Sequence, residues 1–426
     1  MAGLVLIVLP VVLIMLGVPI FAALAAAAAI GIVALGIGTM EPVHSALFGG
    51  LDNFPLLAVP LFIFAGEIMG RGGIARRIVA WVLSILGGVR GSLAIATVAS
   101  AELFGSMSGS SVGCVAAIGK LMIPELNRRG YSEVFSGSLI ASCGAIATII
   151  PPSITLIIYG VTAQQSVPRL FLAGIVPGVI IGVLVSLYLL IHARVKIVPL
   201  TDPVRWSTAL QATREAFWAL FAPVIILGGI YGGIFTPTEA GGIACLYAMV
   251  VSLFIYREMT VRDLWDTALA AARVIAQILI IVSAASAYSW LITTSGLPAR
   301  LVAGIEAMHV STWVLLAIIN VILLLVGSAL EPPAAILILT PLLLPLVVQA
   351  GVDPIHFGII FTVNLAVGMF VPPFGLNLFA VHALFRMPLP QLYRGTFPFI
   401  VIYLAALALI TYVPDLILVP LRFWQH

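Results

Sequence analysis

The sequence predicts an all-α protein that crosses a membrane many times, and three observations support this fold class. Hydrophobic residues make up 62% of the 426 residues and charged residues only 8%, with a mean hydropathy of +1.24. Soluble domains carry about 25% charged residues, so this chain cannot cover itself with a water-compatible surface. Apolar runs recur along the whole chain, and each bilayer crossing needs roughly 20 apolar residues. A stretch from the middle of the chain also recurs near its end.

The apolar runs begin at the N-terminus, where residues 2–18 have no basic segment and no cleavage site. We expect a retained span there, not a signal peptide, and roughly a dozen spans plus two hairpins in all. Two basic stretches, Arg71–Arg90 around Trp81 and Arg257–Arg273 around Trp265, predict interfacial amphipathic helices. The net-basic stretch 192–215 divides the chain, and the positive-inside rule places it in the cytoplasm.

The internal repeat has no gaps. Aligning Pro124 with Pro345 places Gly130 on Gly351, Gly137 on Gly358, Pro151-Pro152 on Pro372-Pro373 and Pro177 on Pro398. Two halves that interrupt a membrane helix at the same place are typical of a secondary transporter whose site lies at the repeat interface. We therefore predict two structural repeats of inverted topology, each with a re-entrant hairpin and a Pro-Pro broken helix.

This pattern divides the chain into a scaffold and a mobile transport domain. Residues 1–90 are expected to form N-terminal scaffold spans with an interfacial helix. Residues 91–191 form transport half 1, with its break at 151–152. Residues 192–310 form the connector and second scaffold segment, and residues 311–426 form transport half 2, with its break at 372–373, and the C-terminal span.

The run from Gly105 to Gly113, rich in Gly and Ser, marks a break in an apolar segment. Glycine costs about 1 kcal/mol relative to alanine in a helix, and serine competes for backbone hydrogen bonds. The run is either a hairpin tip at a binding site or a close-packed helix surface, since Gly105, Gly109 and Gly113 also have small-xxx-small spacing.

Each Pro-Pro pair (Pro151-Pro152 and Pro372-Pro373) removes amide donors. The first pair frees carbonyls one turn upstream, near Ala147 and Thr148. In lipid those oxygens need a partner, which is either Na⁺ or a water or neighbouring hydroxyl.

The second half has its own tip, Gly327–Pro333, and Asn364 and Asn377 flank its break. Buried amides must be bonded, so both asparagines are either ligands or braces for the unwound backbone. Glu331 is either an ion or proton site or the N-cap of a helix that begins at Pro332, and we favour the cap.

Thr236, Pro237 and Glu239 have the spacing of a capping box at a helix start, which indicates a structural role.

Several functions are excluded. Gly113 to Leu121 looks like a phosphate loop but has five residues between its glycines and Leu121 where Ser or Thr should hold Mg²⁺, so we expect no ATP hydrolysis. The histidines show no metal-ligand spacing, and no nucleophile lies beside a base, so we predict no enzyme. A net charge of +3 suggests no nucleic-acid partner, and the three cysteines lack a disulfide or zinc pattern.

Four segments taken together resemble the large membrane subunit of TRAP (tripartite ATP-independent periplasmic) transporters, the DctM family. They are Phe104–Ser111 (FGSMSGSS), Ile149–Ser153 (IIPPS), Gly233–Ala240 (GIFTPTEA) and Phe370–Gly375 (FVPPFG). The resemblance implies a multi-pass permease of the bacterial inner membrane that works with a small four-helix membrane subunit and a periplasmic solute-binding protein. It implies sodium-coupled uptake of organic anions, such as C4-dicarboxylates, keto acids or sialic acids, by an elevator mechanism. No cofactor is expected beyond Na⁺ as the coupling ion.

The resemblance also implies roles for individual residues. A first sodium site would involve Ser106, Ser110, Gly144, Ala147 and Ile149, and a second would involve Gly327, Gly368 and Val371. Substrate would contact the tips, with Ser108, Ser153 and Asn377 as candidates. Arg169 and Arg386 are the nearest candidates for an anion-binding arginine.

Two rival functions remain open from the sequence. One is an ion–carboxylate symporter that needs no binding protein, and the other is a passive channel. A purely structural membrane subunit is disfavoured, because a scaffold has no need for two duplicated helix breaks.

Overall fold

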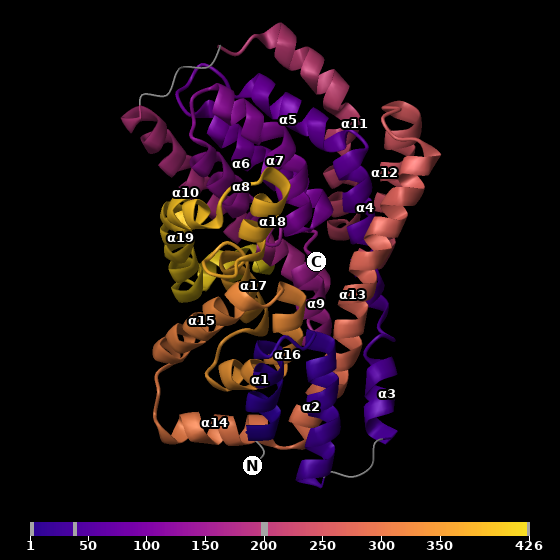
Figure 1. Cartoon of the computed structure of the whole chain (residues 1–426), viewed down its shortest axis with the longest axis vertical. Helices are drawn as coiled ribbons and strands as arrows, with labels where there is room; N and C mark the ends of the chain where they lie inside the picture. Colours follow the sequence, from indigo (N-terminus) through magenta and orange to yellow (C-terminus); the bar gives the residue numbers. More distant parts are fainter. Residues whose placement is uncertain (1–3, 37–40, 197–202, 424–426) are drawn as a thin grey trace.

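The structure is a computed structural model that describes residues 4–36, 41–196 and 203–423 (Figure 1). Within these ranges the regular structure is entirely helical. The predicted connector is described only in part, because residues 197–202 lie outside these ranges. The α-helices are α1 (Leu9–Met15), α2 (Ile20–Leu35), α3 (Glu41–Gly49), α4 (Ala58–Arg71), α5 (Ile74–Ile85), α6 (Ser92–Ser108), α7 (Ser111–Arg128), α8 (Glu133–Ile146), α9 (Ile154–Thr162), α10 (Val167–Val195), α11 (Trp206–Tyr231), α12 (Pro237–Val250), α13 (Val261–Thr294), α14 (Leu297–Ala307), α15 (Thr312–Ala329), α16 (Pro332–Gln349), α17 (Pro354–Gly368), α18 (Leu376–Phe385), α19 (Leu389–Tyr412) and α20 (Asp415–Phe423). Shorter helical turns are Leu4–Val8, Phe54–Leu57 and Val251–Ile255.

Eight helices in the described ranges are long and apolar enough to cross a membrane. They include α10, α11, α13 and α19, together with the hairpin arms α15 and α16. Six further apolar helices have 10–17 residues and are short for a hydrocarbon core of about 30 Å. The chain is therefore a multi-pass membrane protein, with fewer full-length spans than the dozen predicted.

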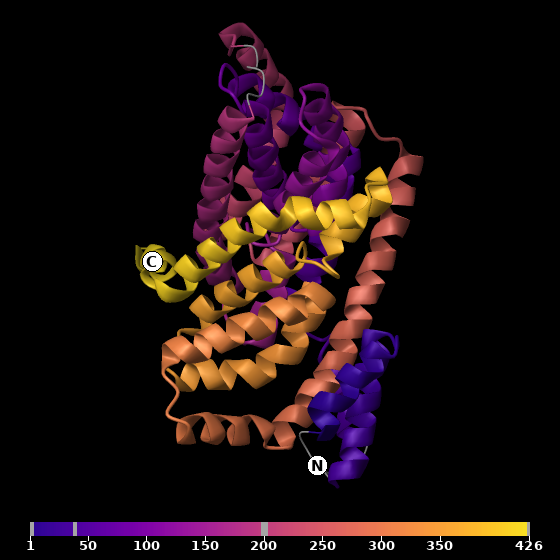
Figure 2. The same ribbon diagram turned by 60° about the vertical axis from the view of Figure 1, so that its left-hand side comes forward.

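One group of helices joins the N-terminal part of the chain to its middle. Helix α12 packs on α4, α11 packs on α5, and the long helix α13 packs on α2, α3 and α4. Figure 2 shows α13 running along one side of the molecule, with the N-terminal helices against its lower part. Residues from distant parts of the chain thus form one packed layer.

Most of the stretch Arg257–Arg273, predicted as an interfacial helix, forms the first part of a longer helix. Helix α13 begins at Val261 and continues without interruption to Thr294, over 34 residues. No Gly or Pro occurs between these ends, so nothing in the sequence breaks the helix. The other predicted interfacial segment does contain a short helix, α5, which packs against α6 and α11.

The remaining helices form a core of two helical hairpins and two interrupted helices. Helices α6 and α7 meet at Gly109-Ser110, and α15 and α16 meet at Leu330-Glu331. Both Pro-Pro pairs interrupt helices as predicted: α8 ends at Ile146 before α9, and α17 ends at Gly368 before α18. Both Pro-Pro peptide bonds are cis.

The two halves of this core pack on each other reciprocally. Helix α9 contacts α16, while α18 contacts α7; likewise α10 contacts α17, while α19 contacts α8. The aligned glycines Gly137 and Gly358 both lie against side chains of the opposite half. A Cβ on Gly137 would meet Met387 and Leu392 of the second half, and one on Gly358 would meet the Tyr159 ring of the first half. Each interrupted helix thus packs against the opposite half of the chain.

Candidate functional site

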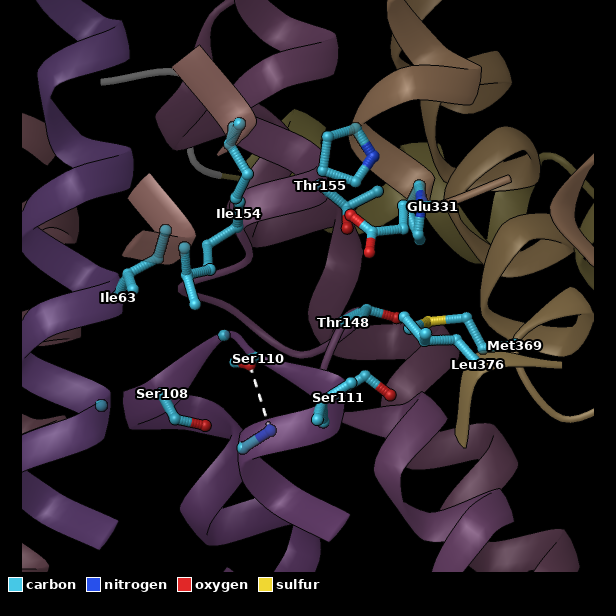
Figure 3. Close-up of a pocket in the computed structure, with 18 of the residues that line it drawn as sticks. Ile63, Ser108, Ser110, Ser111, Thr148, Ile154, Thr155, Glu331, Met369 and Leu376 are labelled. Carbon is cyan, nitrogen blue, oxygen red and sulfur yellow. Dashed lines mark hydrogen bonds between the residues drawn. The ribbon is translucent and has the colours of Figure 1, made fainter. Parts of the chain in front are cut away.

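A cavity of about 330 Å³ lies where both hairpin tips and both helix breaks meet (Figure 3). We call it the central cavity. The first tip contributes Ser108 to Gly113 and the second contributes Glu331 to Pro333. Thr148, Ile154 and Thr155 come from the first break, and Met369 and Leu376 come from the second. The opposite wall is formed by Ile63, Gly66 and Glu67 of α4 and by Val274, Gln277 and Ile278 of α13.

The N-termini of four helices border the central cavity. The first residues of α7, α9, α16 and α18, which are Ser111, Ile154, Pro332 and Leu376, all line it. A helix N-terminus carries about half a positive elementary charge and free backbone N–H groups. Four such ends around one cavity therefore favour an anion, although α16 contributes fewer amides because it begins with Pro332 and Pro333.

The local sequence explains why these helices begin at the cavity. Ser110 accepts a hydrogen bond from the Gly113 amide at 3.2 Å and caps α7. Ser153 accepts one from the Leu156 amide at 3.2 Å and caps α9. Gly109 turns the chain between α6 and α7 at a φ of 57°, which favours glycine. The first tip is thus a helical hairpin turn whose glycines also allow close packing.

Ser108 has a hydroxyl group that no donor or acceptor in the described ranges satisfies. Its side chain is 1% exposed, and its Oγ is buried without a hydrogen-bond partner. Ser108 also lines the central cavity, so an unsatisfied polar group lies in the cavity wall.

Two carboxylates border the same cavity. Glu331 occupies the N-cap position of α16, but its side chain makes no capping hydrogen bond. The helix begins at Pro332 with Glu331 at its N-cap, as predicted, and the same residue also lines the cavity. Glu67 lies on α4 and forms an ion pair with Arg71 at 3.1 Å.

The residues predicted for a first sodium site come from segments that pack closely together. A Cβ on Gly105, next to Ser106, would lie 2.8 Å from the Ala147 Cα. A Cβ on Gly144 would lie 3.1 Å from the Ser111 carbonyl oxygen, next to Ser110. Within the described ranges no donor reaches the carbonyl oxygens of Ala147 and Ile149. The Thr148 carbonyl, in contrast, accepts a hydrogen bond from the Ser153 hydroxyl.

The residues predicted for a second sodium site also come together. A Cβ on Gly368 would lie 2.6 Å from the Gly327 carbonyl oxygen, so the two backbones touch. Here the freed carbonyls already have partners: Gly368 accepts from the Val371 amide at 3.2 Å, and Val371 accepts from the Gly375 amide at 3.1 Å. The first group therefore has more unpaired backbone oxygens than the second.

Comparison with known proteins identifies the family. Residues 7–416 match the model of the tripartite ATP-independent periplasmic transporter, DctM component. The chain belongs to the DctM family. It is thus related to transporter permease subunits and not to enzymes.

Curated relatives with high coverage agree. The chain is 38% identical over 368 residues to the C4-dicarboxylate TRAP transporter large permease protein DctM of Pseudomonas aeruginosa, with 86% of each chain covered. It is 37% identical over 410 residues to the ectoine/5-hydroxyectoine large permease UehC of Ruegeria pomeroyi, with 96% of each covered. The isethionate permease DctMQ of Oleidesulfovibrio alaskensis is 40% identical over 401 residues, covering 93% of this chain and 63% of that one.

Two solved membrane transporters share the fold. The YdaH transporter of Alcanivorax borkumensis superposes with a TM-score of 0.63 at 14% identity, covering 90% of this chain and 89% of that one. The MtrF efflux pump of Neisseria gonorrhoeae superposes with a TM-score of 0.62 at 12% identity, covering 90% of this chain and 84% of that one.

Two further substrate candidates carried over from the DctM family are buried braces. The Asn377 amide accepts from the Ser111 hydroxyl at 2.7 Å and donates to the Ala141 carbonyl at 2.8 Å. It thereby ties the first tip, α8 and α18 together. Ser153 is fully buried between the Thr148 carbonyl and the Leu156 amide. Neither residue lines the central cavity, so of the two interpretations of Asn377 the geometry favours the brace. Asn364 likewise donates to Asn320 and to the Ile360 carbonyl, both at 2.8 Å.

The arginine candidates lie elsewhere. Arg169, near the start of α10, and Arg386, at the end of α18, are exposed, and neither lines the central cavity. Each is separated from its Pro-Pro break by the helix that follows it, α9 or α18. The geometry does not support either residue as the anion-binding arginine.

The sequence reasoning missed the wall of the cavity that α4 and α13 form. Glu67 of α4 and Gln277 of α13 both line it. A carboxylate inside an apolar run is a functional candidate in itself, and this signal could have found Glu67.

The predicted structural pair is present in this DctM-family chain. Thr236 caps α12 by accepting from the Glu239 amide, and the Glu239 carboxylate accepts from the Thr236 amide at 2.8 Å. This capping box lies away from the central cavity.

Proposed function

We propose that the chain is the translocating permease of a TRAP transporter that takes up a small organic anion together with Na⁺. The observation that carries the proposal is the convergence of four helix N-termini on one cavity inside a membrane protein. Relatives named for C4-dicarboxylate and isethionate support a carboxylate or sulfonate as the solute. The unpaired Ser108 hydroxyl lies buried in the cavity wall and would turn toward the solute to donate to one of its oxygens.

Sodium coupling rests on the first break. The unpaired carbonyl oxygens of Ala147 and Ile149, close to the end of α6, are the hard oxygen ligands that Na⁺ prefers. A cation there neutralises charge beside a bound anion. Coupling then follows when Na⁺ and the anion bind the same conformation better than the alternatives.

The motion would be an elevator movement of the core against the scaffold. The mutual packing of α4, α5, α11, α12 and α13 supports residues 1–90 and 192–310 as the scaffold. The reciprocal packing of the hairpins and interrupted helices supports residues 91–191 and 311–426 as two inverted repeats of the transport domain. The small membrane subunit would bind the scaffold, and the periplasmic binding protein would deliver the solute at the bacterial inner membrane.

The test is thermal unfolding of the purified chain in Na⁺ against choline at equal ionic strength, with and without the small subunit. A ligand at 100 times its dissociation constant adds about 2.7 kcal/mol, which moves the midpoint measurably. We expect stabilisation specific to Na⁺ that Pro151→Ala weakens, because alanine restores a donor to the freed carbonyls.

Pro223→Ala is the matched control, since Pro223 lies inside α11, outside the breaks. Equal midpoints in both salts, even with the small subunit present, would remove the sodium assignment. Uptake by liposomes that hold the chain alone would favour the symporter that needs no binding protein.

A further inference from the structure

A second cavity adjoins the central cavity on the α4 and α7 side. We call it the side vestibule; its volume is about 400 Å³. Gly66, Glu67 and Gly113 line both cavities, so the two share a wall. From there the side vestibule extends past Arg71 and Arg76 on one side and Ala117 and Lys120 on the other.

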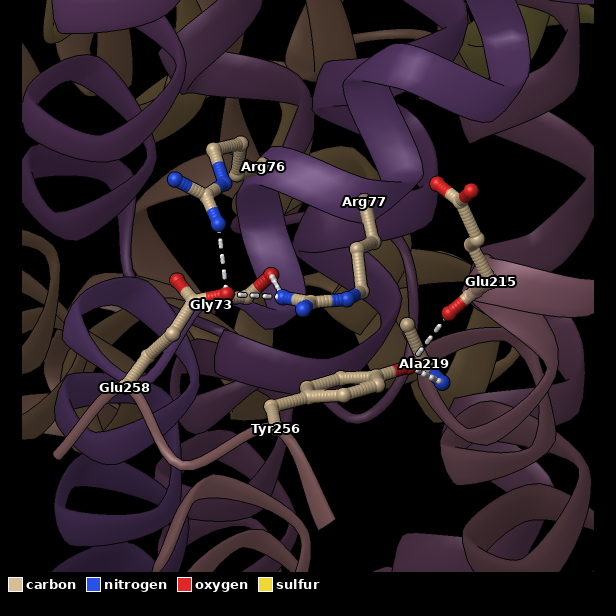
Figure 4. A network of polar contacts seen from close by, with 7 residues as sticks. All are labelled: Gly73, Arg76, Arg77, Glu215, Ala219, Tyr256 and Glu258. Atoms are coloured by element: carbon tan, nitrogen blue, oxygen red, sulfur yellow. Dashed lines mark hydrogen bonds and ion pairs between the residues drawn. The ribbon is translucent and has the colours of Figure 1, made fainter. Parts of the chain in front are cut away.

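The charges of the side vestibule leave one cation unpaired. Arg71 is paired with Glu67 at 3.1 Å, and Arg76 is paired with Glu258 at 2.5 Å. Figure 4 shows Glu258 between Arg76 and Arg77, both of which contact it. Lys120 is exposed and forms no ion pair with any residue in the described ranges.

Lys120 is close enough to the central cavity to attract a departing anion. Lys120 lies seven positions after Gly113 of the shared wall, which is about 10 Å along α7 at 1.5 Å per residue. This distance is comparable to the Debye length of about 8 Å at physiological salt, so the charge of Lys120 is only partly screened there.

The side vestibule lies at the basic end of the molecule. Glu258 ties Arg76 and Arg77 of α5 to the start of α13, and Trp81 donates to the Thr213 hydroxyl of α11 at 3.0 Å, next to the connector. Figure 1 shows α5 and α11 together at this end, with α14 at the other. The positive-inside rule assigns the basic end to the cytoplasm.

We propose that the side vestibule is the cytoplasmic exit for the transported organic anion, and that Lys120 is the cation that draws the anion out of the central cavity. This inference rests on the proposed function. The helix N-termini hold the anion at the tips, and Lys120 lowers the electrostatic cost of leaving them. Lys120 belongs to the run from Gly113 to Leu121, which resembles a phosphate loop but does not fit nucleotide binding. Its lysine would act on the transported anion instead.

The experiment uses Lys120→Cys in the full chain, reconstituted with its partner subunits in liposomes. The three native cysteines are buried, so a thiol reagent should label the new cysteine in preference to them. An aminoethyl thiosulfonate reagent restores a positive charge at the position, whereas a sulfonatoethyl reagent places a negative charge there. We expect several-fold slower uptake for Lys120→Cys, recovery with the aminoethyl adduct, and a further loss with the sulfonatoethyl adduct. Labelling should occur from the cytoplasmic side and slow down when C4-dicarboxylate is added.

Lys196→Cys is the matched control, because Lys196 is an exposed lysine that follows α10, outside the side vestibule. Its adducts should not change uptake. Uptake that is equal for both adducts of Lys120→Cys would overturn the proposal, and so would labelling from the periplasmic side alone. If the unsubstituted complex takes up no organic anion, the proposed function fails; the sidedness of labelling still tests the location of the exit.

Discussion

At the scale of single residues, glycine lets backbones touch where the core needs it. Gly368 and Gly327 come from an interrupted helix and a hairpin arm, and an added Cβ on Gly368 would lie 2.3 Å from the Gly327 carbonyl carbon. In the first half Gly105 meets Ala147 in the same way. Ala147 and Gly368 are aligned positions of the sequence repeat. The contact between hairpin and break is thus built alike in both halves.

Gly368→Ala should destabilise the chain, because the new methyl group meets backbone atoms that cannot rotate away. Overpacking of this kind costs about 1–3 kcal/mol. We expect a lower unfolding midpoint and weaker stabilisation by Na⁺, measured by thermal unfolding in Na⁺ and in choline.

Gly242→Ala provides the control for this variant. A Cβ on Gly242 in α12 meets no atom within 4 Å, and alanine favours a helix over glycine by about 1 kcal/mol. The control should therefore be neutral or stabilising. If both variants melt at the temperature of the parent chain, the close contact at Gly368 is unimportant.

At the scale of helices, rules based on neighbouring residues predicted where helices end but did not predict the length of α13. The Pro-Pro breaks, the turn at Gly109 and the capping box at Thr236 follow from the chemistry of a few neighbouring residues, and the structure has all of them. The extent of α13 was missed because the basic residues near Trp265 suggested an interface, although nothing there ends a helix. The charge pattern predicts where a segment lies relative to the membrane. Only helix-breaking and capping residues predict where a helix ends.

Thr236→Ala should lower the free energy of unfolding by about 1 kcal/mol, because the first turn of α12 loses its cap. Thr236→Ser keeps the hydroxyl and should retain most of the stability. Chemical denaturation in detergent compares the two. A Thr236→Ala variant as stable as the Thr236→Ser variant would show that the capping hydrogen bond contributes nothing.

At the scale of the whole molecule, only one side of the central cavity, formed by the tips and the breaks, could be predicted. The sequence repeat identified both tips and both breaks, because the same residues recur in the same order. It could not show that α4 and α13 close the cavity, since that depends on packing between segments about 200 residues apart. The same limit explains Asn377, whose local sequence does not reveal its partners Ser111 and Ala141.

The scaffold and the core meet closely at Gly66, which offers a test of the elevator movement. A Cβ on Gly66 would lie 3.0 Å from the Cα of Ser108, whereas one on Gly70, a turn later in α4, would lie 3.6 Å from the Phe104 ring. We expect Gly66→Ala to slow reconstituted uptake several-fold while the chain still folds, because the tip must slide past α4. Gly70→Ala should leave uptake unchanged. Equal uptake rates for both variants would indicate that the tip stays in place relative to α4.

The four helix ends around the central cavity also bear on how such a permease can diversify. Main-chain amides are the same whatever side chains surround them, so point substitutions cannot easily erase the attraction for a negative charge or redirect it to one particular molecule. A lineage that acquires a new nutrient therefore has little to gain by changing the residues around these helix ends. In the proposed three-part system, the protein that captures the solute outside is the part that can change instead.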